Sequence, residues 1–488
     1  MNDAYSINAF TDDSDQSMTY DDCDSAITTN SFPRTFHSLT FGSYFNLIIP
    51  PCTLPSTLTS LTFGDRFDQI LEQHTLPDSL RILQLGYRFN QVITHHTLPS
   101  SLKHLTFGKM FNQRLEPNVL PASILILTFG KMFNQPINDG VLPLSLKSLR
   151  LGSEFDQVLD RTTLPNTLTN LSIGTKIAHG LLPDTIKDLS FVGFIDEKED
   201  ITPRSLPLSL TALELKNEST FDRPFLCGAL PRQLKKLIIN DSFNHPITPG
   251  SLPDSLVYLE FNYNSGFIHQ FPDGALPQGL TTLKLGYHYN LPNHHGTLPE
   301  SLQVLSFGSL FNQVLEPGSL PSSLTSLSLG LSYDQHIVAG VLPESLTSLV
   351  TGHSLGSDNR DIVFPSNIKK LILGSNPNIW LLDALLYKPE MVHICFMDKI
   401  VLQDNCKVMK SCMVPMMNLY VQVFIGEDDI NQLVQCYRVL AMVFPNVQTY
   451  ILEIGMNNVE GIFRSIDKTN TVFKTSIGNK IYFIDNNY

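Results

Sequence analysis

Three residues with metal-binding side chains recur at a constant interval near the start of the chain. Cys52, His74 and His96 each stand two residues before a Leu-Pro pair, and His95 adjoins the last of them. Thiolate and imidazole groups are good zinc ligands. The next place in this series is taken by Asn118, however, and no carboxylate completes a ligand set. We therefore predict that these residues hold no metal ion.

The other residues that could do chemistry are isolated. His294 and His295 occupy a similar loop without support from neighbouring repeats, and Asp12-Asp13-Ser14-Asp15 lacks the glycine and distal glutamate of a calcium loop. The acidic run is interpreted as solvated charge. No P-loop, G-x-S-x-G or H-E-x-x-H spacing occurs in the sequence. We predict a protein without catalytic residues, cofactor or metal.

The spacing of the first residues belongs to a repeat that organises most of the chain. A Leu-Pro pair recurs with unchanged spacing at Leu54, Leu76, Leu98, Leu120, Leu142 and Leu164. The spacing changes slightly around Leu182, Leu206 and Leu230, and it settles again at Leu252, Leu276, Leu298, Leu320 and Leu342. With Phe32-Pro33 before and Phe364-Pro365 after, the series contains sixteen copies. A fixed period of roughly 20–29 residues is typical of a leucine-rich-repeat solenoid.

Each position of the repeat L-P-x-S-L-x-x-L-x-F-G-x-x-F-N-Q can be given a structural role. In the copy from 102 to 107, Leu105 and Phe107 share the inner face of a strand, whereas His104 and Thr106 share the outer face. Proline suits the turn that enters the strand, and glycine permits the bend that leaves it. We expect the Asn or Asp after the second aromatic residue to bond to the backbone of its own or a neighbouring coil.

The sequence therefore predicts a β-rich, leucine-rich-repeat-like solenoid of about sixteen 22-residue coils over residues 32–374. A single coil cannot bury its apolar side, so neighbouring coils must stack in register. Residues 1–31 contain seven aspartates and neither Lys nor Arg, and they are interpreted as an acidic disordered tail.

A second region follows the solenoid. From residue 375 to 488 the period is lost, and apolar runs appear at 391–396, 418–425 and 447–454, with a helical pattern beginning at Ile430. TVFKTSI and KIYFID flank Gly478-Asn479 as a hairpin. We interpret the region as a small α/β module that caps the solenoid. It could also recruit a partner.

The segments FNQPI (133–137) and FNHPI (243–247) resemble the FNIP repeat, a leucine-rich-repeat variant named for Phe-Asn-Ile-Pro. FNQVI, FNQRL, FNQVL and FDQIL are related segments, and the resemblance covers about 70% of the chain. It implies a protein-interaction scaffold of the kind found in social amoebae and giant viruses. Several such proteins carry an N-terminal F-box, but the segment before the first copy is too short and too polar for one.

Partner binding is expected on the outward strand positions. The end coils carry mainly Ser and Thr there, and the middle coils carry charged residues and a tyrosine: Asp188, Glu214, Lys236, Tyr258, Glu260 and Lys284. An insertion between Val192 and Ser205 lies in the same region, where a binding site and simple repeat decay are the two interpretations. The Ser and Thr columns are interpreted as solubilising residues rather than a ligand array.

The leading hypothesis is a non-catalytic scaffold that binds a partner protein, which could be a host protein if the chain is viral. The alternatives are a substrate-recognition subunit of a ubiquitin ligase and a hydrolase in the C-terminal module. A formal charge of −13 without a recognisable basic stripe argues against nucleic acid. No membrane segment or secretory signal is visible, and seven scattered cysteines suit a reducing compartment. We expect a cytoplasmic monomer.

Overall fold

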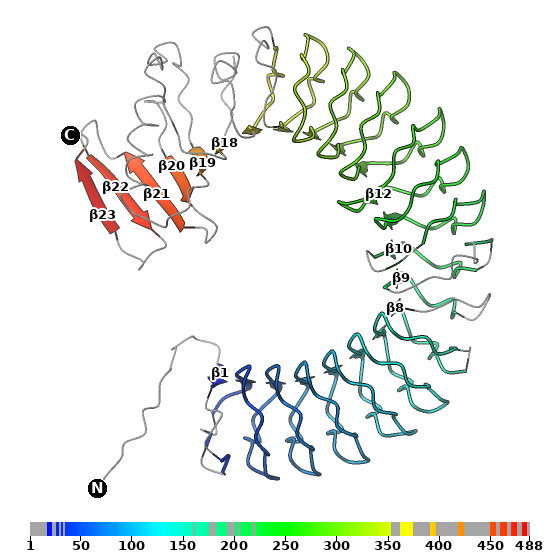
Figure 1. Ribbon diagram of the computed structural model, residues 1–488, viewed down its shortest axis with the longest axis vertical. Helices are drawn as coiled ribbons and strands as arrows, with labels where there is room; N and C mark the ends of the chain where they lie inside the picture. Colours follow the sequence, from blue (N-terminus) through cyan, green and yellow to red (C-terminus); the bar gives the residue numbers. More distant parts are fainter. Residues whose placement is uncertain are drawn as a thin grey trace. The chain divides into compact units, whose positions relative to one another are not determined.

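The computed structural model describes residues 17–21, 26–28, 31–32, 35–159, 162–174, 182–192, 201–203, 205–216, 219, 221–352 and 362–373. It describes only the backbone of residues 391–396, 418–423, 449–454, 459–465, 470–475 and 481–485. The chain divides into two units, Met1–Ser242 and Phe243–Tyr488. In the described residues each unit contains a run of short strands (Figure 1).

The first unit contains strands β1 to β11. Their bounds are β1 Ser17–Tyr20, β2 Ser38–Phe41, β3 Ser60–Thr62, β4 Ile82–Gln84, β5 His104–Thr106, β6 Ile126–Thr128, β7 Ser148–Arg150, β8 Asn170–Ile173, β9 Asp188–Phe191, β10 Ala212–Leu215 and β11 Lys236–Ile239. Each strand pairs in parallel with the next, so equivalent repeat positions lie beside one another, as Leu105 does with Leu127. The predicted stacking of coils is confirmed.

The second unit begins in the same way. Strands β12 Tyr258–Phe261, β13 Thr282–Lys284, β14 Val304–Ser306, β15 Ser326–Ser328, β16 Ser348–Val350 and β17 Lys370–Leu373 form a parallel, in-register series. All sixteen predicted copies therefore supply one strand each, β2 to β17. The fold is a parallel β-solenoid of the leucine-rich-repeat type.

The sheet of the second unit continues beyond the last repeat. Strands β18 Met391–Phe396, β19 Asn418–Val423 and β20 Thr449–Ile454 extend it in parallel, and β21 Val459–Ser465, β22 Asn470–Thr475 and β23 Ile481–Asp485 continue it antiparallel. The expected hairpin is the β22–β23 pair, whereas β21 was not predicted. The predicted helix starting at Ile430 lies outside the described residues, and the capping role of this region stays a prediction.

Part of the predicted acidic tail belongs to the sheet, so its description as disordered is wrong for residues 17–20. Strand β1 pairs in parallel with β2, and Tyr20 is level with Phe41. The Tyr20 ring lies 5.3 Å from that of Phe32 and 5.8 Å from that of Phe41, edge to face in both cases. The signal was present in the sequence, because SMTY is the strand motif SLTF with Met for Leu and Tyr for Phe.

The core of each coil is built from leucine and stacked phenylalanine. The central strand leucines are fully buried, and so are the aromatic residues after the bend. The rings of Phe67 and Phe89 are 6.0 Å apart between centroids and only 7° from parallel, and the rings of Phe107 and Phe111 stack at 3.9 Å within one coil. Aromatic burial of this kind dominates core energetics. The inward side chains are therefore used for packing in the core.

The glycine that follows β2 to β8 and β13 to β16 has a different role from the one expected, whereas Val192, Lys216, Asn240 and Asn262 stand in its place after β9 to β12. The prediction was a bend, and the backbone indeed turns there, since Phe111 N–H donates to the Gly108 carbonyl at 3.3 Å. The stronger constraint is between coils, because a Cβ on Gly108 would lie 1.7 Å from the carbonyl oxygen of Gly86. The equivalent Cβ on Gly130 would lie 2.0 Å from the Gly108 oxygen. Glycine lets neighbouring coils approach to the sheet spacing.

Replacing Gly108 with Ala is expected to lower the free energy of unfolding by about 3 kcal/mol, because the clash is with backbone that cannot move without disturbing two coils. Urea denaturation followed by circular dichroism measures this change. Gly279→Ala is the control, since its Cβ would come no closer than 3.3 Å to another atom, and it should change stability by less than about 1 kcal/mol. Equal effects of the two substitutions would contradict this account of the glycine.

Candidate interaction surface

The outward side of the strands is a surface whose side chains differ from coil to coil. In each strand from β2 to β16 the leucine at the centre of the repeat motif is buried, and the residues on either side of it are exposed or half-buried. These flanking residues are the predicted outward pairs, from Ser38 and Thr40 on β2 to Ser348 and Val350 on β16. We call this side the strand face. It is the place where the predicted binding residues lie.

In the first unit the predicted binding residues are held by their own neighbours. Asp188 is level with Ala212 and then Lys236 in the sheet register. The Asp188 carboxylate accepts a hydrogen bond of 2.6 Å from the amide of Asn170. Glu214 accepts one of 3.0 Å from the Ser190 hydroxyl and lies 3.7 Å from the Lys216 ammonium. Asp188 and Glu214 lie on adjacent strands, but each carboxylate has a partner of its own.

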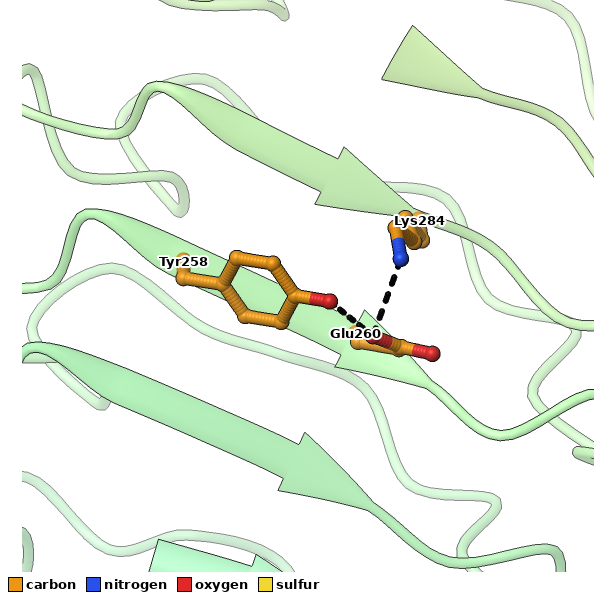
Figure 2. Close-up of polar contacts among 3 residues, drawn as sticks. All are labelled: Tyr258, Glu260 and Lys284. Carbon is orange, nitrogen blue, oxygen red and sulfur yellow. Dashed lines mark hydrogen bonds and ion pairs between the residues drawn. The ribbon is translucent and has the colours of Figure 1, made fainter. Parts of the chain in front are cut away.

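In the second unit the structure brings three predicted residues together (Figure 2). The Tyr258 hydroxyl donates a hydrogen bond to the carboxylate of Glu260, which also lies 3.4 Å from the Lys284 Nζ. The ammonium of Lys284 sits 5.4 Å from the centre of the Tyr258 ring. Tyr258 and Glu260 are on β12 and Lys284 is on β13, so the sheet register makes the cluster.

The phenol and the ammonium of this cluster are poorly suited to act as general bases at neutral pH. Burial raises the pKa of the Tyr258 phenol, and its hydrogen bond to Glu260 raises it further. The hydrogen bond with Tyr258 raises the pKa of Lys284, and the charge of Glu260 acts in the same direction. Both groups keep their protons at neutral pH, whereas a general base works best with a pKa near the operating pH. The cluster therefore holds an aromatic ring, a protonated lysine and a carboxylate together on the strand face.

The Asn or Asp after the second aromatic residue forms a ladder between coils, as predicted. The Asn90 Oδ1 accepts a 2.9 Å hydrogen bond from the backbone N–H of Asn112, and Asn112 does the same for Asn134 at 2.9 Å. The following glutamine adds a second donor, since the Gln135 Nε2 lies 3.1 Å from the Asn112 Oδ1. Asp68 has the same role in an earlier coil, where its Oδ1 accepts a 2.8 Å hydrogen bond from the backbone N–H of Asn90. The ladder satisfies bend amides that have no strand partner.

A second ladder was missed in the sequence. The Ser or Thr in the L-P-x-S-L segment donates its hydroxyl to a leucine or isoleucine carbonyl of the preceding coil. Ser101 bonds to Leu80 at 2.6 Å, Ser123 to Leu102 at 2.5 Å and Ser301 to Leu280 at 2.6 Å. The recurrence of Ser or Thr at this position was the available signal. It places another repeated residue in a structural role.

The column of Cys52, His74 and His96 has a conformational role. Their φ angles are 61°, 66° and 68°, and Asn118 follows with 65°. In seven later coils the position is glycine with positive φ, at Gly140, Gly228, Gly250, Gly274, Gly296, Gly318 and Gly340. This is the left-handed region that favours Gly and Asn. Spacing alone suggested a possible ligand set, and the backbone shows a turn.

The remaining candidate sites are few. In the part of the chain that the structure describes, no group of three or more His, Cys, Asp and Glu residues is placed so that it could hold a metal ion. His294 and His295 are exposed and immediately precede the turn glycine Gly296. No helix within the described ranges is long and apolar enough to cross a membrane.

Comparison with known proteins agrees with this geometry. The FNIP repeat matches residues 45–88, 89–132, 133–176, 221–264, 267–310 and 311–358, which is more than half of the chain. Each match begins at an aromatic residue of the core and spans two or more coils. The chain belongs to the FNIP repeat family.

A solved structure from a giant virus is similar over most of the chain. It is described as the crystal structure of CroV588, a novel circular LRR protein, and it shares 32% sequence identity with this chain at a TM-score of 0.65. The similarity covers 90% of this chain and 62% of CroV588, so the chain spans less than two thirds of that protein. No functionally curated protein matches the chain.

The asparagine ladder predicts a selective effect of substitution. Asn112→Ala removes the acceptor for the N–H of Asn134 and for the amide of Gln135, so the free energy of unfolding should fall by about 1–3 kcal/mol. Asn112→Asp keeps the acceptor, as Asp68 does naturally, and should change it by less than about 0.5 kcal/mol. Chemical denaturation of the full chain measures both. An equal loss in the two variants would show that the acceptor oxygen is not what matters.

The left-handed turn predicts that removing two of the histidines stabilises the protein. His74→Gly/His96→Gly relieves positive φ at two non-glycine residues, and the melting temperature should rise in line with a gain of about 1 kcal/mol. The reverse change, Gly140→Ala, should lower it. Thermal unfolding is measured with and without zinc chloride. If zinc raised the melting temperature of the unsubstituted chain but not that of the double variant, these residues would form a metal site, contrary to our prediction.

Proposed function

We propose that the chain is a non-catalytic scaffold that binds a partner protein through its strand face. One observation carries the proposal: inward and bend positions repeat because they are used for packing and hydrogen bonding, whereas the strand face varies. Along β4 to β7 the first outward residue is Ile82, His104, Ile126 and Ser148 in turn. A regular backbone that presents changing side chains suits recognition of an extended surface.

The residues available on this face are suited to protein partners. The cluster of Tyr258, Glu260 and Lys284 combines an aromatic ring with both charges, and tyrosine is enriched where interfaces derive most of their binding energy. The flanking Ser and Thr residues are small and leave the face accessible. Membership of the FNIP family and similarity to a leucine-rich-repeat protein support a scaffold role. We place the centre of the proposed site in the second unit at this cluster.

The proposal is tested by selecting binders and mapping them. The full chain is immobilised and used to pan a phage-displayed library of random peptides, and enriched peptides are titrated against variants. In Tyr258→Ser/Glu260→Ser/Lys284→Ser we expect at least tenfold weaker binding, because the ring and both charges are lost. The control Lys109→Ser/Lys131→Ser changes exposed residues in the bends and should bind as the unsubstituted chain does. The proposal would be refuted if the enriched peptides lost binding to the control variant but kept binding to the strand-face variant.

A further inference from the structure

A cluster of unpaired cations lies on the first unit, away from the residues singled out by the sequence. Arg81, Lys103 and Lys147 each directly precede a strand and occupy one column of the sheet. The backbone N–H of Lys103 donates to the Arg81 carbonyl at 2.8 Å, that of Leu125 to Lys103 at 2.8 Å, and that of Lys147 to Leu125 at 2.9 Å. Arg150 is outward on β7, level with Thr128 on β6. The four cations therefore gather within four adjacent coils.

The cluster is electrostatically distinct from the rest of the chain. The two outward positions of β4, β5, β6 and β7 and the residue before each strand make twelve positions, which contain four cations and no carboxylate. Their charge is +4 in a chain of net charge −13. Among the described residues, the side chains of Arg81, Lys103, Lys147 and Arg150 make no ion pair or hydrogen bond. This differs from Asp188, Glu214 and Glu260, which are all partnered.

Apolar side chains are interleaved with these cations. Ile82 is 42% exposed and Ile126 is 38% exposed, on the outward side of the sheet where the equivalent residues of β3, β7 and β8 are Ser60, Ser148 and Asn170. His104 lies between them in the register. We define the β4–β7 patch as Arg81, Ile82, Lys103, Ile126, Lys147 and Arg150. A partner that supplies both carboxylates and apolar side chains would interact favourably with both kinds of residue in this patch.

We infer that the β4–β7 patch binds an acidic segment of a partner protein in which carboxylates alternate with apolar side chains. The inference rests on the proposed function and names the chemistry of one partner. The carboxylates of such a segment are complementary to the four unpaired cations, and its apolar side chains cover Ile82 and Ile126. Charge complementarity steers association and selects the partner.

A nucleic acid fits the patch less well. Single-stranded nucleic acids are held by cations that follow the phosphates and by aromatic rings on which bases stack. The twelve positions contain no Phe, Tyr or Trp, and the two exposed isoleucines offer no polar contact to a phosphate or base edge. Aliphatic side chains between cations match a peptide in which apolar residues alternate with carboxylates.

The dimensions set the length of the segment and the strength of binding. Four strands spaced by about 4.8 Å span roughly 15 Å, which an extended peptide covers with about five residues. Such a contact is much smaller than a standard protein interface, so we expect a dissociation constant in the micromolar range, on the order of 10–100 μM. Because the pairs are solvent-exposed, added salt should weaken binding.

The test uses the full chain and synthetic ten-residue peptides, followed by fluorescence anisotropy. An alternating Glu-Val peptide should bind, an alternating Glu-Ser peptide should bind at least tenfold more weakly, and an alternating Lys-Val peptide should not bind. Arg81→Glu/Lys103→Glu should weaken the Glu-Val complex at least tenfold, and Ile126→Ser should weaken it several-fold. The control Lys109→Glu/Lys131→Glu makes the same change in net charge in the bends and should preserve binding.

The result that overturns the inference is equal loss in the control and in the patch variant, or failure of the Glu-Val peptide to bind better than the Lys-Val peptide. A ten-nucleotide oligothymidylate that binds more tightly than Glu-Val would assign the patch to nucleic acid instead. Peptides selected from the displayed library that depend on Tyr258, Glu260 and Lys284 would keep the proposed function intact in each of these cases. The two failures are therefore distinguishable.

Discussion

The structure depends on one constraint: each coil must supply the hydrogen-bond partners that its neighbour lacks. A coil with a short strand leaves many backbone amides in its bends, and an amide without a partner is costly when removed from water. The Asn112 Oδ1 accepts the N–H of Asn134 in the next coil, and the Ser123 hydroxyl donates to the Leu102 carbonyl in the preceding one. These bonds require that consecutive coils have the same local conformation at the bonded positions. The literal repetition of the sequence follows from this requirement.

The same constraint decides where function can reside. Leucine, phenylalanine, glycine, asparagine and serine each have a structural role in most coils, so changing one disturbs a neighbouring coil as well. The outward strand residues are free of that role, because their backbone groups are paired whatever side chain they carry. Variation therefore accumulates on the strand face without loss of the fold. A regular backbone of this kind can present different side chains without a change of fold.

Much of the fold could be predicted because sequence separation maps directly onto spatial contact. The constant repeat length placed Leu105 beside Leu127, and the alternation around the central leucine identified the outward pairs. Strand β1 escaped prediction because it combines two substitutions with a spacing slightly shorter than the repeat, and β21 contains a glycine in a run without clear alternation. The turn at His96 was missed although a signal was present, because the same repeat position is Asn118 in the next coil and glycine in seven later coils.

The charged clusters show what the register adds to the sequence. Tyr258, Glu260 and Lys284 stood out because they occupy outward strand positions that the repeat identifies, and because the end coils carry mainly Ser and Thr there. Arg81, Lys103 and Lys147 come from three separate coils of a chain that is acidic overall, so the expectation that there is no basic stripe was reasonable and is wrong for this column. In the first cluster the carboxylate has a donor and a cation, and it holds the Tyr258 ring and the Lys284 ammonium in place beside each other. The second has unmet charge beside exposed isoleucine, and a partner can satisfy both without first breaking an internal bond.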